Sequence, residues 1–186
     1  MDTHPDRLPW TGVEAADRLL ASDPLALLIG MLLDQQFPME RAFYGPYLLR
    51  DRLGVELDAA TIADYDPEEM TSIFRGPPAI HRFPGSMAAR TQDLCRQVAD
   101  DYEGEAARIW KTASSGEELL RRLEALPGYG RAKARIFVGV IGKRLGDGPP
   151  GWEDVAADWA SIADVASYDD IVALRQAKRA AKQSPR

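Results

Sequence analysis

The sequence predicts an all-α protein. Apolar residues recur at three- and four-residue spacing in almost every periodic segment, which is the pattern of a helix with one buried face. No alternating pattern is long enough to indicate a β-strand, and Gly- and Pro-rich breakers divide the 186 residues into helix-sized pieces. A chain of this length can bury a full core, as one domain or as two small lobes.

The first two expected helices meet at a strong capping signal. Residues 13–21 form a short helix that Ser22, Asp23 and Pro24 bring to an end. Asp23 can cap the next helix, and Pro24 can occupy its first turn. Because residues 24–36 are nearly all apolar, they predict a central, buried helix.

Further helices follow along the chain. The pattern restarts over residues 38–53, a short helix follows Asp58, and another begins at Asp66-Pro67. Residues 75–85, rich in Pro and Gly, predict a rigid loop. Residues 86–102 then predict a longer helix.

Two helical segments, 117–126 and 132–145, are joined by the tight turn Leu126-Pro127-Gly128-Tyr129-Gly130. Its glycines tolerate positive φ and the close approach of another backbone. The first amides of the second helix stay unpaired and, with the helix dipole, favour an anion such as phosphate. A second breaker at residues 146–151 precedes a last helix over 168–182.

Basic residues gather around this turn although the protein as a whole has a net charge of −6. Between Arg121 and Arg144 a single acid, Glu124, stands among seven basic residues. Those residues are Arg121, Arg122, Arg131, Lys133, Arg135, Lys143 and Arg144. Such runs are often only solvated, but a local basic stretch in an acidic protein favours contact with nucleic acid.

Composition restricts the cofactors and the compartment. The single cysteine, Cys95, excludes an intramolecular disulfide and a four-cysteine iron–sulfur loop, and suits a reducing cytosol. The two histidines, His4 and His81, do not form a zinc site with it on any familiar spacing. The longest apolar run, residues 25–33, is too short to cross a bilayer, and the N-terminus does not resemble a signal peptide. We therefore expect a cytoplasmic protein, associated with the nucleoid if bacterial.

The segment from Leu126 to Arg131 resembles the helix-hairpin-helix of the base excision repair DNA glycosylases, the HhH-GPD superfamily. The family hairpin is Leu-Pro-Gly-hydrophobic-Gly followed by a basic or polar residue, and the match is position for position. The resemblance implies a cleft between two helical lobes. One lobe would comprise residues 26–130, and residues 1–25 with 131–186 would form the other. It also implies DNA contacts from Gly128, Tyr129, Gly130, Arg131 and Lys133.

Two adjacent glutamines form a second point of resemblance. Gln35 and Gln36 end the buried helix, where amide groups need partners if they are desolvated. The superfamily has a Leu-x-x-Gln motif at this point, whose glutamine fills the space vacated by an extruded nucleotide. Gln35 matches best, with Gln36 beside it; the alternative is two solvent-facing or capping glutamines.

The resemblance is incomplete at the catalytic carboxylate. The family places an Asp about twenty residues past the second hairpin glycine, where it stabilises positive charge on the sugar. Here that position holds Pro150, so we expect Asp154 to act, with Glu153 and Asp158 in reserve. A helix-start acid without a catalytic role is the alternative.

Enzymes of the superfamily that also cleave the strand carry a lysine two residues past the second hairpin glycine. That position holds Ala132 here, and Lys133 is turned by about 100° on a helix. We therefore expect Lys133 to face phosphate, unless a shifted register brings it into the site.

These observations predict a monofunctional, monomeric DNA glycosylase that hydrolyses the N-glycosidic bond of a flipped base with water. We expect no cofactor, no iron–sulfur cluster and no metal bound by side chains; the one ion considered is a monovalent cation at the hairpin backbone. The alternatives are a non-catalytic DNA-binding module and a helical protein–protein adaptor. The lesion cannot be named from the sequence.

Overall fold

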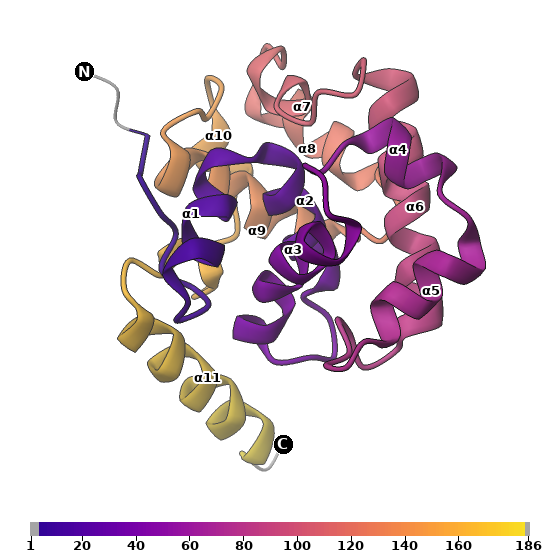
Figure 1. Ribbon diagram of the computed structural model, residues 1–186. Helices are drawn as coiled ribbons and strands as arrows, with labels where there is room; N and C mark the ends of the chain where they lie inside the picture. The colour runs from indigo at the N-terminus through magenta and orange to yellow at the C-terminus, as the bar shows by residue number, and fades with distance from the viewer. Residues whose placement is uncertain (1–3, 185–186) are drawn as a thin grey trace.

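The computed structural model describes residues 4–184, and in that part of the chain every regular element is a helix, as predicted (Figure 1). The α-helices are α1 (Glu14–Ser22), α2 (Pro24–Leu33), α3 (Met39–Leu53), α4 (Ala59–Asp64), α5 (Pro67–Arg75), α6 (Pro84–Asp101), α7 (Arg108–Lys111), α8 (Gly116–Glu124), α9 (Arg131–Gly139), α10 (Trp152–Val155) and α11 (Tyr168–Gln183). A π-helical turn, η1 (Val140–Leu145), continues α9, and a 3-10 turn, η2 (Ile162–Asp164), precedes α11. None of the described helices has the length and apolar character that a membrane span requires.

Helix α2 is the buried centre of the fold. All of residues 25–33 are buried, as the uninterrupted apolar sequence predicts. Asp23 caps the helix, since its side chain accepts hydrogen bonds from the amides of Leu25 and Ala26. The helix ends at Leu33 rather than at Gln36, because the backbone of Asp34 leaves the helical region (φ −77°, ψ 68°). Residues 34–36 therefore form an irregular corner before α3.

Two groups of helices surround α2. Helices α1 and α3 pack directly on it, while α4 and α5 pack on α6, which begins at Pro84. Helix α11 runs along the lower left of Figure 1, where it extends away from the rest of the fold. One continuous cluster of buried apolar side chains runs from the N-terminal segment to the start of α11. The division into lobes of residues 26–130 and of 1–25 with 131–186 stays a prediction, and residues 1–3 and 185–186 lie outside the described part.

The hairpin pair forms as expected, with one difference. Helices α8 and α9 pack against each other across the turn, and α10 packs on both. The predicted helix over residues 132–145 is divided into α9 and η1, because the helical hydrogen bonding widens after Gly139. Helix α7, a single turn, has too short an apolar pattern to be predicted.

Candidate functional site

The hairpin glycines have different roles. Gly128 has φ +79°, and a Cβ there would lie 2.3 Å from Leu32 Cδ1 of α2, so this position requires glycine. Gly130 has an ordinary φ of −75°, and a Cβ there would meet no atom within 4 Å. The start of α9, which no side chain caps, therefore opens onto empty space. This is the geometry that a backbone phosphate needs to approach the helix amides.

The Tyr129 side chain belongs to the core rather than to the exposed surface of the hairpin. Its ring is buried, and its hydroxyl donates a 2.6 Å hydrogen bond to the carbonyl oxygen of Leu28 in α2. Burial raises the pKa of this phenol well above its ordinary value. The predicted DNA contact of Tyr129 is corrected to this extent: its side chain is unavailable, because the aromatic ring packs edge-on against Phe137.

Lys133 points into a pocket and not outward, so the phosphate contact expected from the sequence stays a prediction for a side chain that lies inside. Its Nζ donates a 3.0 Å hydrogen bond to the carbonyl oxygen of Leu32 and lies 5.9 Å from the Tyr129 ring centroid. Burial lowers the pKa of Lys133 to about 8, although Asp34 opposes this by its negative charge. The long side chain reaches back across α9 to the free carbonyl near the end of α2. Arg131 remains on the exposed surface, where it pairs with Glu124 at 2.8 Å.

The corner after α2 supplies the other polar groups. Asp34 is partly buried, and burial raises the pKa of its carboxyl group, opposed first by Lys178 and then by Lys133. Gln35 is also partly buried, and its amide contacts Met87 Sδ at 3.6 Å. Gln36 is exposed and has a φ of +51°, a left-handed conformation that is uncommon for residues other than glycine. Gln36 rather than Gln35 is therefore the glutamine that projects from this corner.

His81 holds the corner in place from behind. It is fully buried, accepts a hydrogen bond from the amide of Phe83 at Nδ1 (3.0 Å), and donates from Nε2 to the carbonyl oxygen of Gln35 (3.1 Å). This pairing requires the neutral ring, and burial lowers the pKa of His81 accordingly. The Pro-rich loop thus fixes the backbone that carries the two glutamines.

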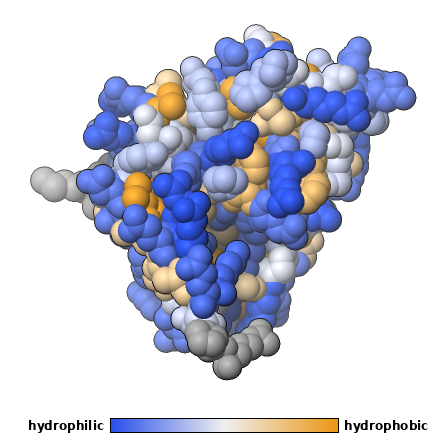
Figure 2. Space-filling view, turned by 90° about the horizontal axis from the view of Figure 1, so that it is seen from below, coloured by the Kyte–Doolittle hydropathy of each residue, from blue (hydrophilic) through white to orange (hydrophobic). Residues whose placement is uncertain are grey.

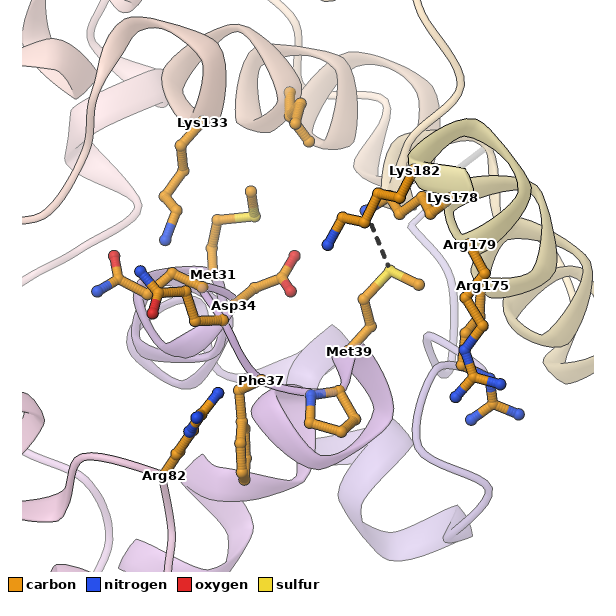
Figure 3. Close-up of a pocket in the computed structure, with 14 residues that line it drawn as sticks. Met31, Asp34, Phe37, Met39, Arg82, Lys133, Arg175, Lys178, Arg179 and Lys182 are labelled. Atoms are coloured by element: carbon orange, nitrogen blue, oxygen red, sulfur yellow. Dashed lines mark hydrogen bonds between the residues drawn. The ribbon is translucent and has the colours of Figure 1, made fainter. Parts of the chain in front are cut away.

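Lys133 and the corner residues 34–36 line a pocket of about 670 Å³ (Figure 3). The pocket lies between the end of α2, the start of α3, α9 and α11. Six cations and one carboxylate line it, in a protein whose net charge is −6. The lining residues are Met31, Asp34, Gln35, Gln36, Phe37, Pro38, Met39, Arg82, Lys133, Ile136, Arg175, Lys178, Arg179 and Lys182. The face seen from below in Figure 2 is mostly hydrophilic and is hollowed near its centre. The charge of this pocket is complementary to an anionic ligand, and its volume is in the range of small-molecule sites.

Asp34 and Lys133 face the same space in the pocket without forming an ion pair (Figure 3). Lys133 enters it from α9 and Asp34 from the corner after α2. The arrangement leaves room for a ligand between an amine and a carboxyl group, which are the two kinds of side chain that cleave glycosidic bonds. Asp34 was not among the residues predicted for the site, although an acid beside two amides at the end of an apolar helix was the available signal.

The predicted carboxylates lie elsewhere. Glu153 and Asp154 are exposed on α10, and Asp158 lies 3.7 Å from Arg135; none of the three lines the pocket. The loop before α10 docks on the start of α8, where the amide of Gly116 donates to the carbonyl oxygen of Pro150 at 2.8 Å. This docking directs the first turn of α10 to solvent.

No protein-family model matches the chain, and neither does any curated protein. Five chains of solved structures match. One is endonuclease III in a trapped covalent intermediate with DNA, an estranged-adenine complex, with 23% identity and a TM-score of 0.45. The match covers 67% of this chain and 57% of that one, which is less than two thirds of its length.

The comparison corrects the expectation that no cofactor and no iron–sulfur cluster are involved. Endonuclease III is a [4Fe-4S] protein, so resemblance to it does not argue against a cluster. The residues of this chain do not fit such a group, because the sequence contains one cysteine, Cys95, which is buried in α6. Within residues 4–184, no three His, Cys, Asp or Glu side chains are grouped so that they could hold a metal ion.

Proposed function

We propose that this protein is a DNA glycosylase that binds duplex DNA through its hairpin and cleaves the N-glycosidic bond of a base extruded into the pocket. The observation that supports this most is that Lys133, in the first turn of the helix that follows Gly130, lines the same pocket as Asp34. A strand held by its phosphate at Gly130 would run past the mouth of a pocket that is lined by cations. The side chains of the pocket cannot reach a base that is stacked inside a duplex, so the nucleotide has to rotate out of the helix and into the pocket.

Asp34 is the carboxyl group that we propose for the chemistry. As the bond to the base breaks, positive charge develops on the deoxyribose, and a carboxylate beside it stabilises that charge and orients or deprotonates a water molecule. Lys178 and Lys133 favour the ionised form of Asp34 and oppose the effect of burial on its pKa. Asp154, which is expected from the sequence, is the competing candidate.

Gln36 is the residue that we propose to fill the space left by the extruded nucleotide. It is exposed at the rim of the pocket, and its corner is fixed through the hydrogen bond between His81 and Gln35. Unstacking a nucleotide costs a few kcal/mol, least for a damaged or mispaired base, and this supplies part of the selectivity.

A second candidate function, strand cleavage by a lyase step, is favoured by the inward position of Lys133. A neutral amine can attack the sugar carbon C1′ as the base leaves with the bonding electron pair, and the amine now attached to C1′ loses a proton. The C1′–O4′ bond then breaks, O4′ takes up a proton, and the nitrogen lone pair forms the C=N bond of a Schiff base. With a pKa of about 8, part of the Lys133 population is neutral at physiological pH. Because Ala132 occupies the family's lysine position, hydrolysis by water remains the primary proposal.

The experiment is an excision assay on a panel of labelled duplexes, each with one lesion or mismatch. The panel includes uracil, alkylated purines, hypoxanthine, oxidised guanine, and adenine opposite oxidised guanine. Wild type is compared with Asp34→Asn, with Asp154→Asn as the matched control and Lys133→Gln as the amine variant. Each reaction is analysed with and without hot alkali, and with borohydride to reduce a Schiff base.

The outcomes separate the candidates. Product that appears only after alkali and is lost in Asp34→Asn supports hydrolysis with Asp34 as the catalytic carboxylate. Loss of product in Asp154→Asn alone would instead identify Asp154 of α10 as that carboxylate. Cleavage without alkali, and borohydride trapping that requires Lys133, would establish the lyase. No product on any lesion, with binding that depends on Gly130, would indicate a non-catalytic DNA-binding module. Binding that is insensitive to salt and to Gly130→Asp would indicate the protein–protein adaptor.

A further inference from the structure

Helix α11 places a row of cations along one wall of the pocket. Arg175, Lys178, Arg179 and Lys182 recur at three- and four-residue spacing, so they share one helix face, and all four line the pocket. In Figure 3 the side chains of Lys178 and Lys182 point from α11 into the space that Asp34 and Lys133 also face. The cationic face of the helix is thus directed at the site.

Few protein groups neutralise these cations. Arg175 forms an ion pair with Glu40, and Lys178 Nζ lies 3.6 Å from the thioether of Met39, which is a weak acceptor. Among residues 4–184, neither Arg179 nor Lys182 has an ion-pair partner. Across the pocket, Arg82 lies 5.3 Å from the Phe83 ring centroid and forms no ion pair with any residue of the described part of the chain.

The ordinary reasons for cations on a helix do not account for the row. The dipole favours them only in the last turn, and the row occupies more than one turn. Like charges four residues apart, as at 175/179 and 178/182, destabilise a helix by about 0.2–0.5 kcal/mol per pair. The two acids of α11, Asp169 and Asp170, lie in its first turn and cannot offset this. The unfavourable arrangement calls for an anion from outside the chain.

We infer that the cationic face of α11 binds the phosphates of the nucleic-acid strand whose nucleotide enters the pocket. The inference rests on the proposed function. It gives the strand a second phosphate-binding surface, α11, in addition to the hairpin. From residue 175 to residue 182 the row extends about 10 Å along the helix. Phosphates of one strand are about 3.4 Å apart along the duplex axis, so a helix lying parallel to that axis would span about three such spacings with this row. One nucleotide phosphate would leave most of the row unused.

The test compares two charge-matched triple variants. Lys178→Gln, Arg179→Gln and Lys182→Gln together remove the exposed part of the row, and Gln keeps a helix propensity close to that of Lys and Arg. The control combines Arg18→Gln, Arg96→Gln and Lys111→Gln on α1, α6 and α7, which removes the same charge away from the pocket. A third variant, Lys178→Arg with Lys182→Arg, keeps the charge.

Binding of a fluorescent duplex is measured by anisotropy over a range of salt concentrations. The α11 triple variant should lose about 100-fold in affinity at 0.1 M salt, and its slope of log K against log salt should become less negative by about 2 to 3. The control triple variant should have a slope of log K against log salt close to that of wild type. The variant Lys178→Arg/Lys182→Arg should bind with wild-type affinity. If the α11 variant and the control have equal slopes, the inference is wrong.

A parallel Gly130→Asp variant keeps this result separate from the proposed function. If Gly130→Asp loses binding while the α11 variant does not, the hairpin binds DNA and only the role of α11 is refuted. If neither variant affects binding, the proposed function fails together with the inference. Urea unfolding of each variant shows whether a loss of affinity arises from a loss of fold, which the exposure of all three substituted residues argues against.

Discussion

Replacing Lys133 by methionine should stabilise the fold at neutral pH although it removes a functional group. Lys133 is held where burial lowers its pKa from 10.5 to about 8, so the folded protein bears a cost for keeping this amine charged. At 1.36 kcal/mol per pH unit, that difference corresponds to about 3 kcal/mol. The variant also loses the hydrogen bond to the Leu32 carbonyl, worth about 1 kcal/mol. The expected net gain in the free energy of unfolding at pH 7 is about 2 kcal/mol.

The sign of the pH dependence follows from proton binding. Between pH 8 and 10.5 the unfolded chain binds more protons at Lys133 than the folded protein, so wild-type stability gains from this residue as the pH rises. The cost of the charged amine is fully present below about pH 8 and disappears toward pH 10.5. The advantage of Lys133→Met should therefore fall from about 2 kcal/mol at pH 7 to near zero at pH 10. Ionisation of Tyr129 and Cys95 affects both proteins alike, because both contain these residues.

The assay is urea unfolding followed by circular dichroism at pH 7 and pH 10, with linear extrapolation to water. Lys111→Met, at an exposed position of α7, is the control and should show no such change with pH. Lys133→Met also leaves the Asp34 carboxylate without one of its two neighbouring cations, which could lower stability. In the double variant Lys133→Met/Asp34→Asn this charge is absent, so the effect of Lys133 is measured alone. A Lys133→Met protein that is less stable than wild type at pH 7, also in the Asp34→Asn background, would refute the reasoning.

Three further predictions concern the hairpin and the corner after α2. Gly130→Ala should cost less than about 0.5 kcal/mol, and Gly128→Ala at least about 1 kcal/mol, because only Gly128 has a positive φ and a close neighbour; urea unfolding compares the pair. Tyr129→Phe should cost about 1 kcal/mol by removing the hydrogen bond from the phenol hydroxyl to the Leu28 carbonyl and leaving a gap beside it, and equal unfolding midpoints would contradict this. Gln36→Gly should raise the free energy of unfolding by about 1 kcal/mol relative to Gln36→Ala, because glycine adopts φ +51° without strain. Both Gln36 variants should excise more slowly than wild type, and excision at the wild-type rate would exclude the filling role.

The elements that local sequence signals specify were predictable. The apolar run of α2, its Asp23 cap and the glycine turn between α8 and α9 all form as the residues indicate, because each depends on contacts within a few positions. The end of α2 was not predictable to the residue. Nothing in the sequence shows that Asp34 leaves the helical region, since helix ends depend on tertiary packing.

The site was harder to predict because it depends on how helices are rotated and where loops dock. Lys133 was expected outside, but its flexible side chain reaches the Leu32 carbonyl of a different helix. Asp154 was expected inside, but the contact between Gly116 and Pro150 directs α10 outward. The row of α11 contributes to the pocket from about 140 residues beyond Asp34 in the chain, a proximity that periodicity does not encode.

The attachment of the hairpin to α2 has a mechanical consequence. The Tyr129 hydroxyl, the Gly128 backbone and the Lys133 amine each meet α2, at the Leu28 carbonyl, the Leu32 side chain and the Leu32 carbonyl respectively. These contacts hold the turn between α8 and α9 at a fixed distance from the corner at residues 34–36 that follows α2. Under the proposed function, a strand bound at the hairpin would present to the pocket the nucleotide that lies at this fixed distance.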